Sequence, residues 1–260
     1  MKQRIITAVI VLLLFLPIVY IGGWAFNLLV YFVATIGLME LLMMRKSAKY
    51  IVPFILTAGL LWVLLYPGQQ LMAGTYNKID ITLIAVLLLL SYTVLVKNKF
   101  TFEDAGFHAL SAIYIGSGLY YIMLTRDAGL EYVAYGILIV LATDTGAYFF
   151  GRAFGRHKLW PEISPNKTIE GALGGVILAC VVAVIFYLFV PLPTSLGALL
   201  VVTVLASIVG QVGDLVESAF KRHYNVKDSG KIFPGHGGVL DRFDSWLFVF
   251  PLLHFIHFIS

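Results

Sequence analysis

The sequence contains little charge. Asp, Glu, Lys and Arg make up 12% of its 260 residues, and 60% of the residues are hydrophobic. Soluble globular domains carry roughly a quarter charged residues. With a mean hydropathy of +0.92, the composition excludes an ordinary soluble domain and predicts an integral membrane protein.

Cysteine is nearly absent as well. Cys180 is the single cysteine and lies within an apolar run, so no disulfide can form within the chain and a buried, unreactive thiol is expected. The short alternating pattern of a membrane β-barrel is lacking. The G-x-x-x-x-G-K-[ST] motif is lacking too, which excludes a P-loop nucleotide site.

Long apolar runs alternate with short polar segments along the chain. A run of roughly 17 to 23 residues is long enough for a helix to cross the hydrocarbon core of a bilayer. We therefore predict an all-α fold, a polytopic bundle of about nine membrane helices. The predicted spans are Ile5–Ile21, Phe26–Met44, Ile51–Tyr66, Ile81–Val96, Phe107–Leu124, Tyr132–Phe150, Glu170–Val190, Leu196–Ser218 and Leu240–Ile259.

The basic residues predict the orientation of these helices. Cytoplasmic loops are enriched in Lys and Arg, and a cytoplasmic N-terminus leaves only Lys78 and Arg126 in the outside loops. Because this rule accounts for the net charge of +4, binding of nucleic acid is not expected. The residues of the inside loops are Arg45, Lys46, Lys49, Lys97, Lys99, Arg152, Arg156, Lys158, Lys167, Lys221, Arg222, Lys227 and Lys231.

Charge also divides the chain into two parts. Eight of the fourteen acidic and nine of the eighteen basic residues lie between positions 144 and 244. We predict a scaffold of five helices in residues 1–130 and a catalytic part in residues 131–260, with cytoplasmic loops at 151–169 and 219–239. In the scaffold, Glu40 is expected to form an interfacial ion pair with Arg45.

Four acidic residues fall in or at the ends of the predicted spans: Asp144, Glu170, Asp214 and Glu217. An acidic residue at the centre of a membrane helix costs about 2.5 to 3.5 kcal/mol on an insertion scale. Such residues therefore need partners or a function.

Helical spacing groups the carboxylates with other polar residues. At about 100° per residue, side chains three or four positions apart share a face. One face carries Gln211, Asp214 and Ser218, and another carries Asp241, Asp244 and Ser245. Because the two helices are joined by one loop, both faces are expected to meet at the cytoplasmic end.

Oxygen ligands without a cysteine or a suitable histidine pair favour Mg²⁺ over zinc. The carboxylates therefore predict a magnesium site. The alternative is simple ion pairing, of Asp241 with Arg242 or of Asp214 with Lys221.

Two polar segments accompany the carboxylates. In the segment 221–238, the glycine-rich turn from Pro234 to Gly238 would bring backbone N–H groups to an anion at a helix N-terminus. In the segment 151–171, Ser164-Pro165 predicts a helix entrance, with Glu170 near the first turn. We expect the stretch Gly213–Ser245 and the segment Gly151–Gly171 to form one cavity. The protein would be a membrane enzyme that acts on a phosphate-bearing lipid and a polyphosphate with Mg²⁺.

The run from Ser218 to Asp244 resembles the signature of the phosphatidate cytidylyltransferase (CDP-diglyceride synthetase) family. It reads Ser218-Ala219-Phe220-Lys221-Arg222, Lys227-Asp228, and Pro234-Gly235-His236-Gly237-Gly238-Val239-Leu240-Asp241-Arg242-Phe243-Asp244. Further blocks that resemble the family are Asp144-Thr145-Gly146-Ala147-Tyr148, Ser164-Pro165-Asn166-Lys167-Thr168 and Gly213-Asp214-Leu215. The resemblance covers roughly the second half of the chain.

The resemblance implies transfer of a cytidylyl group from CTP to phosphatidic acid, giving CDP-diacylglycerol and pyrophosphate. It implies an enzyme of the inner (cytoplasmic) membrane, in contact with membrane lipid, and a homodimer. Asp214 and Asp241 would bind Mg²⁺, and Asp144 and Asp244 would orient groups or hold a second cation. Residues implied to bind phosphate or shape the nucleotide site are Lys167, Lys221, Arg222, Lys227, Ser164, Asn166, Ser218, His236, Gly237, Gly238 and Arg242.

Two other functions stay open on the sequence. A CTP-dependent kinase of a polyprenol or phytol would need the same metal, nucleotide and membrane, but it would release CDP instead of pyrophosphate. A cation transporter could use Asp144, Glu170, Asp214 and Asp241 as its pathway.

Overall fold

The computed structural model describes residue 13 and residues 15–68, 70–71, 75–232 and 237–259. By packing, the chain divides into two compact units. The first comprises Met1–Leu124 and Asp228–Leu240, and the second comprises Thr125–Lys227 and Asp241–Ser260.

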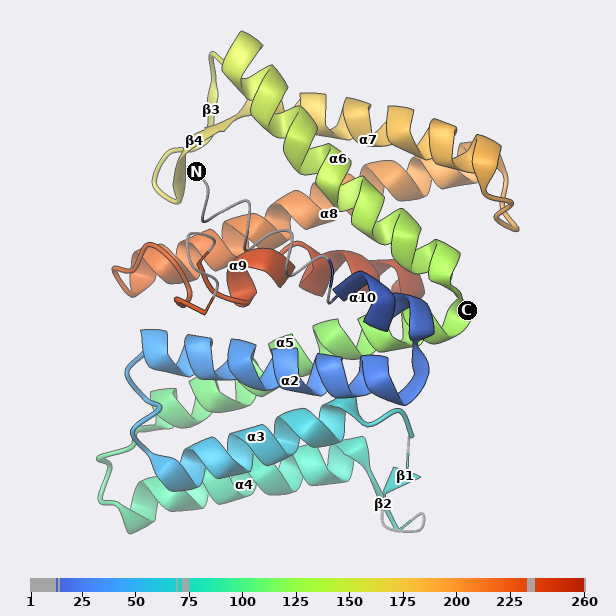
Figure 1. Ribbon diagram of the computed structural model, residues 1–260. Helices are drawn as coiled ribbons and strands as arrows, with labels where there is room; N and C mark the ends of the chain where they lie inside the picture. The colour runs from blue at the N-terminus through green and yellow to red at the C-terminus, as the bar shows by residue number, and fades with distance from the viewer. Residues whose placement is uncertain (1–12, 14, 69, 72–74, 233–236, 260) are drawn as a thin grey trace. The chain divides into compact units, whose positions relative to one another are not determined.

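The first unit is built from antiparallel helices (Figure 1). They are α2 (Gly23–Met44), α3 (Ile51–Leu65), α4 (Lys78–Leu95) and most of α5 (Phe102–Ala128), with a small hairpin of β1 (Gln70–Leu71) and β2 (Tyr76–Asn77) before α4. A capping box starts α4, because Asn77 and Asp80 each accept the other's backbone N–H at 2.9 Å. Hydrophobic side chains such as Leu38 and Leu61 are fully buried between the helices.

The second unit carries the longer helices and one hairpin (Figure 1). Its elements are α6 (Leu130–Phe154), β3 (Lys158–Trp160), β4 (Ser164–Thr168), α7 (Ile169–Phe189), α8 (Leu196–His223) and α10 (Trp246–Phe255), preceded by the single turn α9 (Leu240–Phe243). The strands β3 and β4 pair antiparallel, with Lys158 opposite Thr168 and Trp160 opposite Ser164.

Glycine lets α6 and α7 pack with their backbones in near contact. A Cβ atom at Gly146 of α6 would lie 2.7 Å from the carbonyl oxygen of Gly174 and 2.9 Å from Cα of Gly175 on α7. Small residues allow this close approach between helices in membranes. Asp144 lies two residues before Gly146, about 200° around α6, and so points to another face of this helix.

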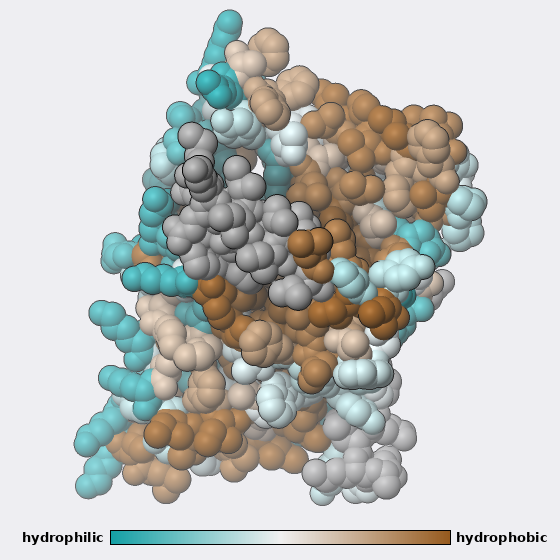
Figure 2. All heavy atoms as spheres, viewed as in Figure 1, coloured by the Kyte–Doolittle hydropathy of each residue, from teal (hydrophilic) through white to brown (hydrophobic). Residues whose placement is uncertain are grey.

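Among the described residues, six helices are long and apolar enough to cross a membrane: α2, α4, α5, α6, α7 and α8. Two apolar helices, α3 and α10, are shorter. Large apolar side chains such as Leu173, Ile177 and Leu188 project from α7 and are more than half exposed, and Figure 2 shows apolar surface over this flank. These features define a nearly all-α, multi-pass membrane protein.

The predicted first and last spans are not confirmed by the structure. Most of Ile5–Ile21 lies outside the described residues, so the count of nine stays a prediction. The single last helix, Leu240–Ile259, is wrong, because the chain turns between α9 and α10. At this turn the backbone oxygen of Asp244 lies so near Gly213 of α8 that a Cβ there would come within 2.6 Å.

Candidate active site

A cavity of about 450 Å³ opens in the second unit. Its walls come from the C-terminal half of α6, the β3–β4 hairpin, the start of α7 and the polar face of α8. The residues lining it are Asp144, Ala147, Tyr148, Gly151, Arg152, Leu159, Asn166, Lys167, Thr168, Gly171, Ala172, Gln211 and Asp214. The cavity therefore joins charged groups to an apolar wall within one membrane-helix bundle.

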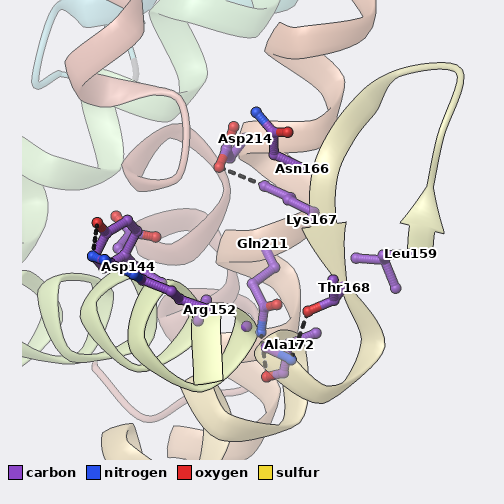
Figure 3. Close-up of a pocket in the computed structure, with 13 residues that line it drawn as sticks. Asp144, Arg152, Leu159, Asn166, Lys167, Thr168, Ala172, Gln211 and Asp214 are labelled. Atoms are coloured by element: carbon purple, nitrogen blue, oxygen red, sulfur yellow. Dashed lines mark hydrogen bonds and ion pairs between the residues drawn. The ribbon is translucent and has the colours of Figure 1, made fainter. Parts of the chain in front are cut away.

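An ion pair crosses this cavity from the hairpin to α8. Lys167 extends from β4, and its Nζ lies 2.5 Å from Oδ2 of Asp214, as Figure 3 shows. The side chains are 26% and 32% exposed, so solvent and a ligand can reach both. Ser218, one turn further along α8, donates to Oδ1 of Asp214 at 3.3 Å, which confirms that the predicted polar face of α8 exists.

A second lysine lies between two carboxylates. Nζ of Lys221 donates to Oδ1 of Asp241 at 2.7 Å and forms a close ion pair with Glu217, one turn earlier on α8. The side chain of Glu217 is only 1% exposed and that of Asp241 is 6% exposed. Burying charges is tolerated when they are paired in this way, so α8 presents Lys221 in a fixed position beside Asp241.

The hairpin is held in place by its own polar groups. The side chain of Thr168 accepts the N–H of Gly171 at 3.1 Å and caps α7. Glu170 accepts N–H groups from the backbone of Arg156 and His157. The polar run that begins at Ser164-Pro165 does lead into the helix, but it forms strand β4, which the sequence analysis does not predict. The helix starts after Thr168, and the placement of Glu170 in its first turn is confirmed.

Further carboxylates act on the same region electrostatically. Asp244, in the turn between α9 and α10, lies within electrostatic range of Asp214, Asp144 and Lys221. Burial raises the pKa of Asp244 to about 7, and the negative charges of Asp214 and Asp144 act in the same direction. Several carboxylates close together provide the oxygen ligands that a hard cation such as Mg²⁺ prefers.

The geometry of a metal centre is not assembled among the described side chains. No group of three or more His, Cys, Asp or Glu residues within them has the arrangement of a metal site. Asp214 and Asp241 are each paired with a lysine instead. Ion pairing, which the sequence left open as the alternative, is present for both aspartates, but with other bases than Arg242 for Asp241 and Lys221 for Asp214.

The predicted site residues fall into three groups. Asp144, Asn166, Lys167 and Asp214 line the cavity. Among the described residues of Gly213–Ser245, Asp214 alone shares this pocket with the segment Gly151–Gly171, so the expected joint cavity is confirmed only in part. Lys221 and Asp241 form the second ion pair, and Asp244 acts on the region through its charge. The remaining described residues neither line the cavity nor belong to this ion pair: Ser164, Ser218, Arg222, Lys227, Arg242, Gly237 and Gly238. His236 lies outside the described residues.

Arg222 has a contact that the sequence does not indicate. Its Nε donates to the carbonyl oxygen of Ile163 at 3.1 Å, which links the end of α8 to the turn of the hairpin. A guanidinium has five N–H donors, so the remaining four can still meet a phosphate.

The end of the glycine-rich turn binds a carboxylate of the protein itself. Glu40, from α2 of the first unit, accepts the backbone N–H groups of Val239 and Leu240 at 2.9 and 3.0 Å. Val239 and Leu240 directly follow the turn Pro234–Gly238, and the expectation for the N–H groups of that turn stays a prediction. The expected pair of Glu40 with Arg45 is also wrong, because Arg45 binds Asp104 at 2.8 Å.

Three side chains of the site were not assigned a role from the sequence. Glu217 stands four residues before Lys221, a spacing that predicts an ion pair on a helix. Arg152 and Gln211 line the cavity, and Nη1 of Arg152 lies 3.4 Å from the hydroxyl of Tyr148 on the same helix. Arg152 stands two turns after Asp144 on α6, a spacing that could have indicated its place in the cavity.

Fold and site together define a multi-pass membrane protein with a charged cavity among its helices, able to receive a ligand that carries phosphate. The chain belongs to the cytidylyltransferase family, whose model it matches over residues 2–260.

Curated relatives resemble the chain along almost its whole length. The phosphatidate cytidylyltransferase of Bacillus subtilis (strain 168) is 51% identical over 261 residues, covering 98% of this chain and 97% of the relative. That of Staphylococcus haemolyticus (strain JCSC1435) is also 51% identical, covering 98% of both chains. That of Staphylococcus aureus (strain COL) is 48% identical with the same coverage.

Proposed function

We propose that this protein transfers the cytidylyl group of CTP to phosphatidate, giving CDP-diacylglycerol and pyrophosphate. The observation that carries the proposal is the cavity of the second unit, where Lys167 and Asp214 meet beside an apolar wall in a membrane-helix bundle. The relatives named phosphatidate cytidylyltransferase, which this chain matches over almost its whole length, support the same reaction.

The reaction requires positioning more than it requires a base. A phosphate monoester has its second pKa near 6 and is largely ionised at neutral pH, so a phosphate oxygen of phosphatidate can attack without losing a proton to the protein. The oxygen bonds to the α-phosphorus of CTP, the bond from this phosphorus to the bridging oxygen breaks, and pyrophosphate leaves with the electron pair. The protein must hold the two phosphates in line and balance their charge.

Lysines of the site supply that balance. Lys167 reaches into the cavity and is exposed enough to exchange its contact with Asp214 for a phosphate oxygen. Lys221 is held by two carboxylates, Glu217 and Asp241, so its charge is fixed in place before substrate binds. Arg222 and Lys227 lie exposed at the end of α8 and beyond it, where they can meet the parts of a triphosphate that extend into water.

We propose Asp214 and Asp241 as ligands of Mg²⁺, with Asp144 and Asp244 orienting groups or holding a second cation. The carboxylates of Asp214 and Asp144 support this, since they act electrostatically on Asp244 and a cation would offset their negative charge. When bound, Mg²⁺ supplies positive charge at the phosphates of the attacking and leaving groups. Pairing of the two aspartates with lysines orients their carboxylates.

The basic loops support a cytoplasmic position for this site. We propose that the N-terminus is cytoplasmic and that the chain crosses the inner membrane about nine times, with α9 and α10 together as the last crossing. Lys167 and the end of α8 then lie on the cytoplasmic side. CTP would then reach the cavity from water while phosphatidate stays in the bilayer. We also propose a homodimer, on the family resemblance alone.

The products test the proposal. Purified protein is incubated with CTP labelled at the α-phosphorus, phosphatidate and Mg²⁺. We expect label in the lipid and one pyrophosphate released for each labelled lipid. A lipid kinase would instead leave the label in CDP, and a cation transporter would carry ions into proteoliposomes without CTP; either result would reject the proposal.

A further inference from the structure

Glu40 is a buried carboxylate far from the residues of the proposed site in the sequence. It lies near the end of α2 and is 6% exposed. A buried charge is costly unless it is paired and hydrogen-bonded. The nearest cation in the sequence, Arg45, binds Asp104 instead, so the chain must satisfy Glu40 in another way.

In the described parts of the segment 228–240, residues 228–232 and 237–240, three donors bind this carboxylate. Oε2 accepts from Oγ of Ser229 at 3.0 Å and from the N–H of Leu240 at 3.0 Å, and Oε1 accepts from the N–H of Val239 at 2.9 Å. The donors come from residues about 190 to 200 positions away. Glu40 therefore holds both described pieces of this segment, residues 228–232 and 237–240, at α2.

Two glycines make room for the carboxylate. A Cβ atom at Gly238 would lie 2.5 Å from each oxygen of Glu40, and one at Gly230 would overlap the carboxylate as well. The glycines of the signature segment thus fit a side chain of this protein closely. At these positions the segment is shaped around Glu40.

Leu240 is held by its side chain as well as by its backbone. It is 2% exposed, and a Cβ atom at Gly37, one turn before Glu40 on α2, would lie 3.3 Å from Cδ2 of Leu240. The backbone at Leu240 is thus fixed by a hydrogen bond and by packing. The next residue in the chain is Asp241.

We propose that Glu40 is a positioning residue for Asp241: it holds the backbone of Val239 and Leu240 and so sets where α9 begins and where the Asp241 carboxylate is presented. The inference rests on the proposed role of Asp241 in binding the cation. It gives α2, otherwise part of the scaffold, a role in the reaction without any contact to substrate.

The test compares four purified variants with wild type. Glu40→Gln is nearly isosteric, but its amide nitrogen cannot accept an N–H. Glu40→Asp keeps the charge on a shorter side chain. Ser229→Ala removes one donor and leaves the two backbone bonds. Glu103→Gln is the matched control, since Glu103 is an exposed carboxylate of the same unit.

Three quantities are measured for each variant: kcat and KM with CTP and phosphatidate, binding of Mn²⁺ alone by electron paramagnetic resonance, and the unfolding temperature. For Glu40→Gln we expect a 10- to 100-fold lower kcat, a KM for phosphatidate within twofold of wild type, and at least tenfold weaker Mn²⁺ binding. Glu40→Asp should recover part of both losses, and Glu103→Gln should match wild type.

A purely structural role gives a different pattern. If folded Glu40→Gln protein unfolds at a lower temperature but keeps the kcat and Mn²⁺ affinity of wild type, the proposal is overturned. Should Glu40→Gln fail to fold, Ser229→Ala decides: a two- to fivefold loss of kcat and of Mn²⁺ affinity supports the proposal, and wild-type values overturn it.

Asp241→Asn, measured alongside, separates this inference from the proposed site. Wild-type kcat and Mn²⁺ binding in Asp241→Asn would overturn the role of Asp241 and the inference with it. An impaired Asp241→Asn beside an unimpaired Glu40→Gln would overturn the inference alone.

Discussion

Replacing Lys167 by glutamine should reduce the rate of the reaction far more than it reduces stability. Nζ of Lys167 lies 2.5 Å from Asp214, and about a quarter to a third of each side chain is exposed. A partly exposed ion pair contributes at most about 1 kcal/mol to folding, since water screens it. A hydrogen bond from a charged lysine to a phosphate is worth about 1.5 to 3 kcal/mol, which corresponds to a roughly 10- to 150-fold lower kcat/KM.

The matched control for this variant is Lys158→Gln. Lys158 is exposed on β3 of the same hairpin and does not line the cavity. Both variants are assayed for label transfer from CTP to phosphatidate and for thermal unfolding. The reasoning is refuted if Lys167→Gln loses no more kcat/KM than Lys158→Gln, or if its loss of rate is matched by a loss of several kcal/mol in stability.

Three further outcomes follow from the structure. Gly146→Ala should destabilise the protein by about 1 to 3 kcal/mol, because the new Cβ would lie 2.7 Å from the Gly174 oxygen, whereas Gly197→Ala, with open space around it, should not; unfolding temperatures in detergent decide. Glu217→Gln should lower kcat at least about tenfold by freeing one side of Lys221, and equal rates for it and for Glu162→Gln, an exposed control on the hairpin, would contradict this. Removing divalent cations with a chelator should lower the rate at least about a hundredfold, with recovery on adding Mg²⁺; full activity in chelator would contradict the proposed cation site.

Much of the fold follows from the apolar runs of the sequence. The helices α2 to α8 begin and end within five residues of their predicted positions, counting only predicted spans with described counterparts. Hydrophobic length and flanking polar residues determine these segments locally. The turn at Asp244 depends on close packing against Gly213 of another helix. A local sequence pattern cannot predict such a contact.

The site was harder to predict than the helices. The face of α8 that carries Asp214 and Ser218 follows from helical spacing, because both side chains belong to one element. The partners of Asp214 and Asp241 depend on distances between different helices and strands. Other basic residues stand near both aspartates in the sequence, so the sequence does not single out Lys167 and Lys221. The hydrogen bonds of Glu40 could not be predicted for the same reason, since its partners lie about 200 positions away in the sequence.

The most direct test of the central claim is the rate at which Asp214→Asn and Asp241→Asn proteins transfer the labelled cytidylyl group to phosphatidate. Asp127→Asn, an exposed carboxylate at the end of α5, serves as the control. If these two aspartates bind the cation and orient the lysines, each folded variant should be slower by about a thousandfold, the equivalent of about 4 kcal/mol, while Asp127→Asn matches wild type. Near-native turnover by folded Asp214→Asn and Asp241→Asn would contradict the account.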